Sequence, residues 1–283
     1  MQKKIKTVKT LLEALPFIKE FNNEIVVVKY GGLAQSSPQL KEKFAEDILL
    51  MYLVGMKPII VHGSGEKITD MLESLKIEMK FVEGQKVISK EIMRISEMVL
   101  SGEINKEIVS LLNSHGAKGI GMSGKDAHFI IAKAKDFSKW GLSGNITQVK
   151  SDVLLNLIEN NFIPVIAPLS ASEEMGHPGF YIDEDVCAAW IAKEVGAKKI
   201  VFLSDSRGVC NKNNELLCTL TQGEVERLKT SEAVHGGMLA KVNACMEALD
   251  GGVEKAHIID GRIEHSILLE LFTQDGIGTQ IVK

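Results

Sequence analysis

The chain has 283 residues, 45% of them apolar and 25% charged, and a net charge of −4 with both signs dispersed. This balance predicts a globular protein with a large core, and it gives no electrostatic case for nucleic acid or an anionic membrane as partner. No apolar run approaches the ~20 residues of a membrane helix, the N-terminus lacks the features of a signal peptide, and the cysteines form no zinc or disulfide pattern, so we expect a cytoplasmic protein.

The first predicted element is an N-terminal helix. Its apolar residues recur at helical spacing, at Val8, Leu11, Leu12, Leu15 and Ile18. Pro16 lies inside this pattern and predicts a kink or a break. A buried strand, IVVVK, follows over residues 25–29, and an amphipathic helix follows over residues 39–56.

The rest of the chain alternates predicted strands and helices. We expect strands within residues 57–65, 128–135, 145–150, 162–170, 198–205 and 255–261. We expect helices over residues 66–77, 89–116 (two helices broken at Gly102), 151–161 (Ser151 as N-cap), 184–196, 236–252 and 264–273. The Gly/Pro-rich residues 171–180 are the best internal linker. This order predicts an α/β protein, with a mostly parallel open sheet between helices.

Glycines and lysines gather where the predicted strands end, which is where such sheets bind ligands. The turns read Lys29-Tyr-Gly31-Gly32, His62-Gly63-Ser64-Gly65 and Ser204-Asp205 with Gly208 beyond, and Gly236 and Gly237 open the helix that carries Lys241. A lysine that ends a buried strand is costly unless it meets an anion. Glycines allow close approach to a phosphate, and free N–H groups at a helix start hold it. One glycine pair could equally be a tight turn, but the whole set predicts a site for phosphates or for a phosphoryl group in transfer.

Two other glycine-rich segments fail as known nucleotide motifs. Residues 119–126, GIGMSGKD, nearly match the phosphate loop GxxxxGK[ST], but Asp126 stands where a magnesium-binding hydroxyl is needed. Residues 62–68, HGSGEKI, lack the third glycine of the dinucleotide fingerprint, because Ile68 occupies its place.

Taken together and in order, these segments resemble the amino acid kinase family from about Ile25 to Thr279. The resemblance is carried by VVVKYGG (26–32), KPIIVHGSG (57–65), residues 97–126, GGMLAKVNACMEAL (236–249) and residues 257–279. Within the family, the chain is most similar to arginine-sensitive members that phosphorylate N-acetyl-L-glutamate with ATP and Mg²⁺ to give an acyl phosphate. The resemblance implies an N-terminal helix (1–22), an acid-substrate lobe (23–182) and an ATP-binding lobe with a C-terminal arginine site (183–283).

The resemblance also assigns roles to residues on the catalytic and nucleotide side. It implies that Lys29 stabilises the phosphoryl group in transit, that Lys241 does so from the nucleotide side, and that Asp185 holds both lysines in place. The implied ATP-binding residues are Gly31, Gly32, Ser204, Asp205, Gly208, Lys212 and Gly237. No protein ligand to a metal is implied, because Mg²⁺ would bridge the nucleotide phosphates.

The acid side departs from the family pattern. The implied acid-binding residues are Ser64, Gly65, Lys86 and Tyr181. Ser64 replaces the middle of three glycines, Lys86 replaces an arginine, and Tyr181 and Asp183 replace two asparagines. A lysine offers a point charge where an arginine offers a bidentate fork. Two alternatives therefore stay open: an enzyme of this fold that acts on another carboxylate or on carbamate, and a catalytically weakened arginine-binding relative.

Two regulatory features follow from the same resemblance. The N-terminal helix would interlace with other copies to make a homohexamer, a trimer of dimers. The alternative is a helix that packs on its own subunit. Arginine would inhibit by binding at His257, Glu270 and Gly276.

Overall fold

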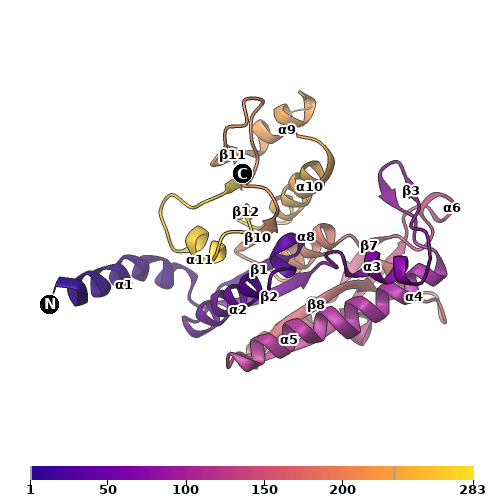
Figure 1. The fold of residues 1–283 in the computed structure, drawn as a ribbon, viewed down its shortest axis with the longest axis horizontal. Helices are drawn as coiled ribbons and strands as arrows, with labels where there is room; N and C mark the ends of the chain where they lie inside the picture. The colour runs from indigo at the N-terminus through magenta and orange to yellow at the C-terminus, as the bar shows by residue number, and fades with distance from the viewer. Residues whose placement is uncertain (1, 232–233) are drawn as a thin grey trace.

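The computed structural model describes residues 2–231 and 234–283, with side chains from Leu12 onward (Figure 1). Its centre is a nine-stranded sheet in the order β11-β13-β12-β10-β1-β2-β8-β5, with β9 added beside β8. The strands are β1 (Ile25–Tyr30), β2 (Lys57–His62), β5 (Gly119–Gly124), β8 (Ile163–Ser170), β9 (Phe180–Tyr181), β10 (Lys199–Ser204), β11 (Thr219–Thr221), β12 (Lys255–Asp260) and β13 (Thr279–Val282). Neighbours run parallel except β9 against β8 and β13 against β12, so the predicted mostly parallel sheet is confirmed.

Helices cover this sheet, and two antiparallel hairpins lie beside it. The helices are α1 (Gln2–Phe21), α2 (Pro38–Leu53), α3 (Lys67–Ser74), α4 (Lys90–Glu97), α5 (Asn105–Ser114), α6 (Phe137–Trp140), α7 (Ser151–Glu159), α8 (Glu184–Glu194), α9 (Gln222–Thr230), α10 (Gly236–Asp250) and α11 (Ser266–Leu271). The hairpins join β3 (Phe81–Val82) to β4 (Gln85–Lys86) and β6 (Ile130–Ala134) to β7 (Gly144–Val149). The valines of β1 are fully buried, as expected for a central parallel strand covered on both faces.

Three local expectations need correction. The helix does not break at Gly102: a π-helical segment, Met98–Ile104, joins α4 to α5, and its wider turns keep the chain helical. Ser151 is the first residue of α7 rather than its cap, and the backbone N–H of the preceding Lys150 donates to the carbonyl of Phe129. There is no break at Pro16, because α1 continues through it to Phe21, which is buried in the core.

The predicted linker, residues 171–180, connects two strands of the same sheet. It lies between β8 and β9, and β9 turns back to pair with β8. Beyond it, β10 returns to the centre of the sheet and pairs directly with β1. The two predicted lobes therefore share one sheet, and their boundary at residue 182 stays a prediction.

The N-terminal helix extends away from the rest of the molecule (Figure 1). Its last turn is anchored by Phe21, whereas Leu12 and Leu15 are 58% and 40% exposed. The side chains of Val8 and Leu11, part of the predicted apolar stripe, lie outside the described residues. Among the helices of the described chain, none has the length and apolar character to span a membrane.

Candidate active site

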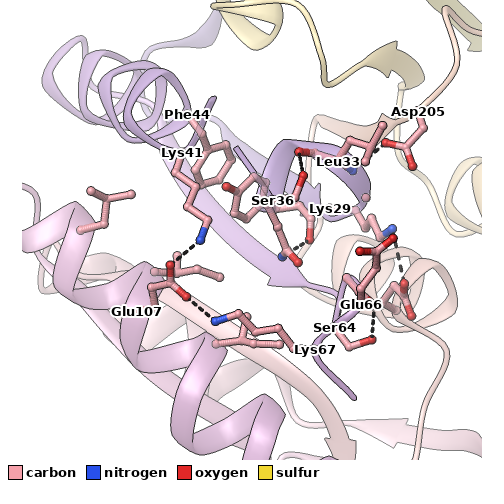
Figure 2. Close-up of a pocket in the computed structure, with 18 of the residues that line it drawn as sticks. Lys29, Leu33, Ser36, Lys41, Phe44, Ser64, Glu66, Lys67, Glu107 and Asp205 are labelled. Carbon is pink, nitrogen blue, oxygen red and sulfur yellow. Dashed lines mark hydrogen bonds and ion pairs between the residues drawn. The ribbon is translucent and has the colours of Figure 1, made fainter. Parts of the chain in front are cut away.

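The candidate site lies where three neighbouring strands end. In the order β10-β1-β2, Lys29 is in register with Phe202 and Val61, and Tyr30 is in register with His62. The turns that follow these strands therefore meet at one edge of the sheet. They open into a cavity of about 500 Å³, whose lining includes Lys29, Gly32, Ser64, Gly65, Lys86, Glu184, Asp205 and Lys241 (Figure 2).

Asp185 joins the two predicted catalytic lysines. Its Oδ1 lies 3.2 Å from the ammonium of Lys29 and its Oδ2 lies 2.7 Å from that of Lys241. Lys29 and Asp185 are buried. Burial alone would lower the pKa of Lys29, but Asp185 and Glu184 raise it above its ordinary value. Burial would likewise raise the pKa of Asp185, whereas the two lysines lower it. Lys29 and Asp185 are therefore charged at neutral pH, and the side chains of both lysines face one cavity.

The start of α8 fixes Asp185 in this position. The side chain of Asp183 caps the helix, and its Oδ1 accepts hydrogen bonds from the backbone N–H groups of Asp185 (3.0 Å) and Val186 (3.2 Å). Asp183 is exposed on its outer side, but partial loss of water around its carboxyl group and the adjacent carboxylates of Glu184 and Asp185 raise its pKa to about 6. Asp183 is thus engaged with the helix rather than facing the cavity, whereas Glu184 lines the cavity and lies 3.6 Å from Lys29.

The glycines after β1 make room for two charged groups. A Cβ on Gly31 would lie 2.8 Å from the Lys29 ammonium. Gly32 has a φ of +65°, and a Cβ there would lie 2.5 Å from Oδ1 of Asp205. That carboxylate accepts a hydrogen bond of 2.7 Å from the backbone N–H of Leu33 (Figure 2). Asp205 therefore ties the turn after β10 to the turn after β1, and only glycine fits where it crosses.

The other residues assigned to ATP are more scattered. Ser204 is buried at the end of β10, with its hydroxyl 3.0 Å from that of Ser206. Gly208 has a φ of +137°, and a Cβ there would lie 2.6 Å from the hydroxyl of Thr279, so packing alone requires glycine. Lys212 lies in an exposed turn, and Gly237 is exposed in the first turn of α10. Of the predicted ATP residues, Gly32 and Asp205 line the cavity.

The predicted acid-binding residues come from the turn after β2 and from the short strands β4 and β9. Ser64 and Gly65 line the cavity directly after β2, and Lys86 lines it from β4. Tyr181 is 8% exposed and lies behind Lys86, whose ammonium is 5.9 Å from the centroid of its ring. Burial raises the pKa of the Tyr181 hydroxyl well above its usual value, so it stays neutral. Among the predicted acid-binding residues, Lys86 is therefore the one that brings a basic side chain to the cavity.

Several lining residues come from helices, and the analysis of strand ends missed them. Lys67 of α3 pairs with Glu107 of α5 at 2.7 Å and with the neighbouring Glu103 at 2.8 Å, and Lys41 of α2 also pairs with Glu107 (Figure 2). Phe44, another residue of the lining, stacks on Tyr30. No sequence motif links these residues, because the packing of α2, α3 and α5 alone brings them to one wall.

The three residues predicted to bind arginine meet at a separate place. Nδ1 of His257 lies 2.7 Å from Oε1 of Glu270, and Oε2 of Glu270 accepts hydrogen bonds from the backbone N–H groups of Ile277 and Gly278. Gly276 has a φ of +60°, and a Cβ there would lie 2.7 Å from Glu270. Burial lowers the pKa of His257, so its ring is neutral and donates to Glu270. None of these residues lines the cavity.

The lining of the cavity suits the phosphate chain of a nucleotide. Two lysines, a glycine turn that a Cβ would fill and an open cavity suit a phosphate chain. Within residues 2–231 and 234–283, no group of three His, Cys, Asp or Glu side chains is placed to hold a metal ion.

Comparison with known proteins gives a family match and close relatives. The model of the amino acid kinase family matches residues 24–260. An acetylglutamate kinase from Sulfurimonas denitrificans is 72% identical, covering 99% of each chain, and one from Nitratiruptor sp. is 58% identical, covering 100% of this chain and 99% of the relative. Among solved structures, N-acetylglutamate synthase from Neisseria gonorrhoeae superposes with a TM-score of 0.87 at 24% identity, over 98% of this chain and 63% of that one.

Proposed function

The chain belongs to the amino acid kinase family, and on that premise we propose that it transfers a phosphoryl group from ATP to the side-chain carboxylate of N-acetyl-L-glutamate. The product is N-acetyl-L-glutamyl 5-phosphate, made in the cytoplasm as a step of arginine biosynthesis. One observation carries the proposal: Asp185 holds Lys29 and Lys241 at a single cavity. The identity to relatives named acetylglutamate kinase selects the acid among the substrates of the family.

The chemistry required of the protein is positioning and charge neutralisation. A carboxylate is ionised at neutral pH, so it can attack phosphorus without a general base. Lys29 offsets the charge on the phosphoryl group as it passes, and Lys241 offsets the charge left on the nucleotide. Asp185 keeps the two ammonium groups at a fixed separation. ATP supplies the phosphoryl group when bound, with Mg²⁺ on its phosphates.

A hydroxamate assay tests this function directly. An acyl phosphate reacts with hydroxylamine, so product formation with ATP reports carboxylate phosphorylation whatever the acid. The purified chain is expected to respond most strongly to N-acetyl-L-glutamate in a panel with glutamate, other N-acyl dicarboxylates and, by a coupled ADP assay, carbamate. A stronger response to another acid would favour the first alternative, and no response to any acid would favour a weakened relative.

Replacing Lys86 by arginine is expected to strengthen acid binding. A guanidinium can bind a carboxylate through two parallel hydrogen bonds, and the stacking distance to Tyr181 leaves room for a planar group. The Michaelis constant for N-acetyl-L-glutamate should fall by about threefold to tenfold, the effect of about one stronger charged hydrogen bond. Steady-state kinetics of Lys86→Arg, with Lys90→Arg as a nearby control, measure it. A higher Michaelis constant in Lys86→Arg would mean that this pocket suits a different acid.

We also propose that the protein is a homohexamer built through α1. The helix extends from the body, and Leu12 and Leu15 expose apolar surface that a second copy would cover. Removing residues 1–21 is therefore expected to reduce the hexamer to dimers, and removing residues 1–15, which spares the buried Phe21, is expected to do the same with the core intact. Light scattering measures the mass, and circular dichroism checks the fold. Dimers in the full-length chain, or hexamers in the truncated one, would contradict the proposal.

Arginine is the proposed inhibitor, and the cluster of His257, Glu270 and Gly276 is its proposed site. Nε2 of the buried His257 has no hydrogen-bond partner within the described residues, and the neutral ring leaves it as an acceptor. A guanidinium offers five donors that suit such an acceptor beside a carboxylate. Because the cluster does not line the cavity, inhibition there would have to act through a change of shape.

A further inference from the structure

Three consecutive carboxylates begin at the end of β9 and enter α8, and each has a different environment. Asp183 accepts two backbone hydrogen bonds, and Asp185 contacts two lysines at 3.2 and 2.7 Å. Glu184 is held far less firmly. Its one polar contact among the described residues is the ammonium of Lys29 at 3.6 Å, which is longer than a hydrogen bond. Its carboxylate can therefore leave this position at little cost.

The position of Glu184 is the one at which an acceptor acid would have to approach. It lines the cavity together with Lys29, Ser64 and Lys86. Its Oε1 lies 2.9 Å from the point that a Cβ on Gly63 would occupy, so the carboxylate rests on the turn after β2. The side chain is 28% exposed, which shows that it opens toward the cavity rather than into the core.

The local charge balance makes this carboxylate a competitor of an anionic substrate. Lys29 and Lys241 supply two positive charges, and Asp185 and Glu184 supply two negative ones. An acid that placed its carboxylate beside Lys29 would meet Glu184 at close range, and two like charges in a partly buried site repel strongly. Lys29 is buried, so water screens this repulsion less than it would at the surface.

We propose that Glu184 is a displaceable counter-ion of Lys29 that sets the affinity for the acceptor acid. In the chain alone, its carboxylate neutralises Lys29. When the acid binds, its carboxylate takes that place and the side chain of Glu184 turns outward through the cavity mouth. The inference rests on the proposed function, and it concerns the acid rather than the nucleotide.

The test compares Glu184→Gln and Glu184→Ala with the wild type. Removing the competing charge should lower the Michaelis constant for N-acetyl-L-glutamate by about tenfold, while turnover and the Michaelis constant for ATP change much less. Glu194→Gln is the matched control, because Glu194 is exposed on the same helix and the change in charge is the same. The control should behave as the wild type.

Two kinetic results would overturn the inference. The first is an unchanged or higher Michaelis constant for the acid in both Glu184 variants, and the second is an equal gain in affinity for ATP. If the wild type fails to phosphorylate N-acetyl-L-glutamate, the proposed function is wrong, and calorimetric titration of that acid replaces kinetics as the test of the inference. Tighter binding to Glu184→Gln than to the wild type then supports the inference, and equal binding contradicts it.

Discussion

Replacing Lys29 or Lys241 by methionine is expected to lower turnover by about 100-fold or more, the effect of removing one group that stabilises transition-state charge. Methionine keeps most of the side-chain volume, so the change removes the ammonium and little packing. Both lysines contact Asp185, so Asp185→Asn should also lower turnover, by releasing both of them at once. Steady-state kinetics with saturating ATP and acid measure these losses.

The control for the lysine variants must separate catalysis from folding. Lys193→Met changes a half-buried lysine on α8 that pairs with Glu247 at 3.3 Å, away from the cavity, and should leave turnover near that of the wild type. Lys29→Met leaves the buried carboxylate of Asp185 with one partner fewer, so the melting temperature of this variant should fall as well. If a folded Lys29→Met or Lys241→Met variant had near-normal turnover, that lysine would not stabilise the transition state.

The sheet could be predicted from the sequence because its strands leave a strong local signal. Continuous apolar runs such as those of β1 and β10, which end at Lys29 and Ser204, are typical of buried parallel strands. The short strands β11, at the edge of the sheet, and β13, between β11 and β12, carry no such run and are set by pairing with neighbours far along the chain. The strand β5 was not predicted, because its glycine-rich sequence, GIGMSG, is typical of a loop. It forms a strand through its pairing with β8.

The part of the site that lies at strand ends could be predicted from the sequence, and the part that lies on helices could not. Lys29, near the end of β1, and Asp205, directly after β10, reach the cavity because topology alone puts strand ends together. Lys41, Lys67 and Glu107 reach it through helix packing, which no short motif encodes. The sequence likewise did not predict how the carboxylates of residues 183–185 are paired, since only the structure shows that Asp183 caps α8.

Loss of the Glu270 carboxylate is expected to lower both stability and sensitivity to arginine. The carboxylate accepts hydrogen bonds from His257 and from the backbone N–H groups of Ile277 and Gly278. Glu270→Ala leaves these buried donors without partners, which should cost about 3 kcal/mol of unfolding free energy. Denaturant unfolding measures this cost, and Glu264→Ala, an exposed change before the same helix, should cost little.

The unfolding free energy that the Glu270 carboxylate contributes should depend on pH and should decrease as pH falls. Burial alone would raise the pKa of Glu270, but the hydrogen bonds from His257 and the backbone lower it below its ordinary value. A carboxyl group whose pKa is lower in the folded state stabilises the fold above its unfolded pKa, and that stability is lost as pH falls through the folded pKa. The gap in stability between the wild type and Glu270→Gln should therefore narrow on acidification. A gap that widens would show that the carboxyl group is protonated in the folded protein at neutral pH.

The same variants decide the regulatory role. Arginine at millimolar concentration should inhibit the wild type, and Glu270→Gln, which keeps the shape of the side chain, should lose that inhibition while retaining turnover, because Glu270 does not line the cavity. Bound N-acetyl-L-glutamate and ATP should in turn weaken arginine binding, since coupling between two sites is reciprocal. Calorimetric titration of arginine with and without the substrates measures the coupling. Full inhibition of a folded Glu270→Gln variant would place the arginine site elsewhere, and an uninhibited wild type would leave Glu270 with its structural role alone.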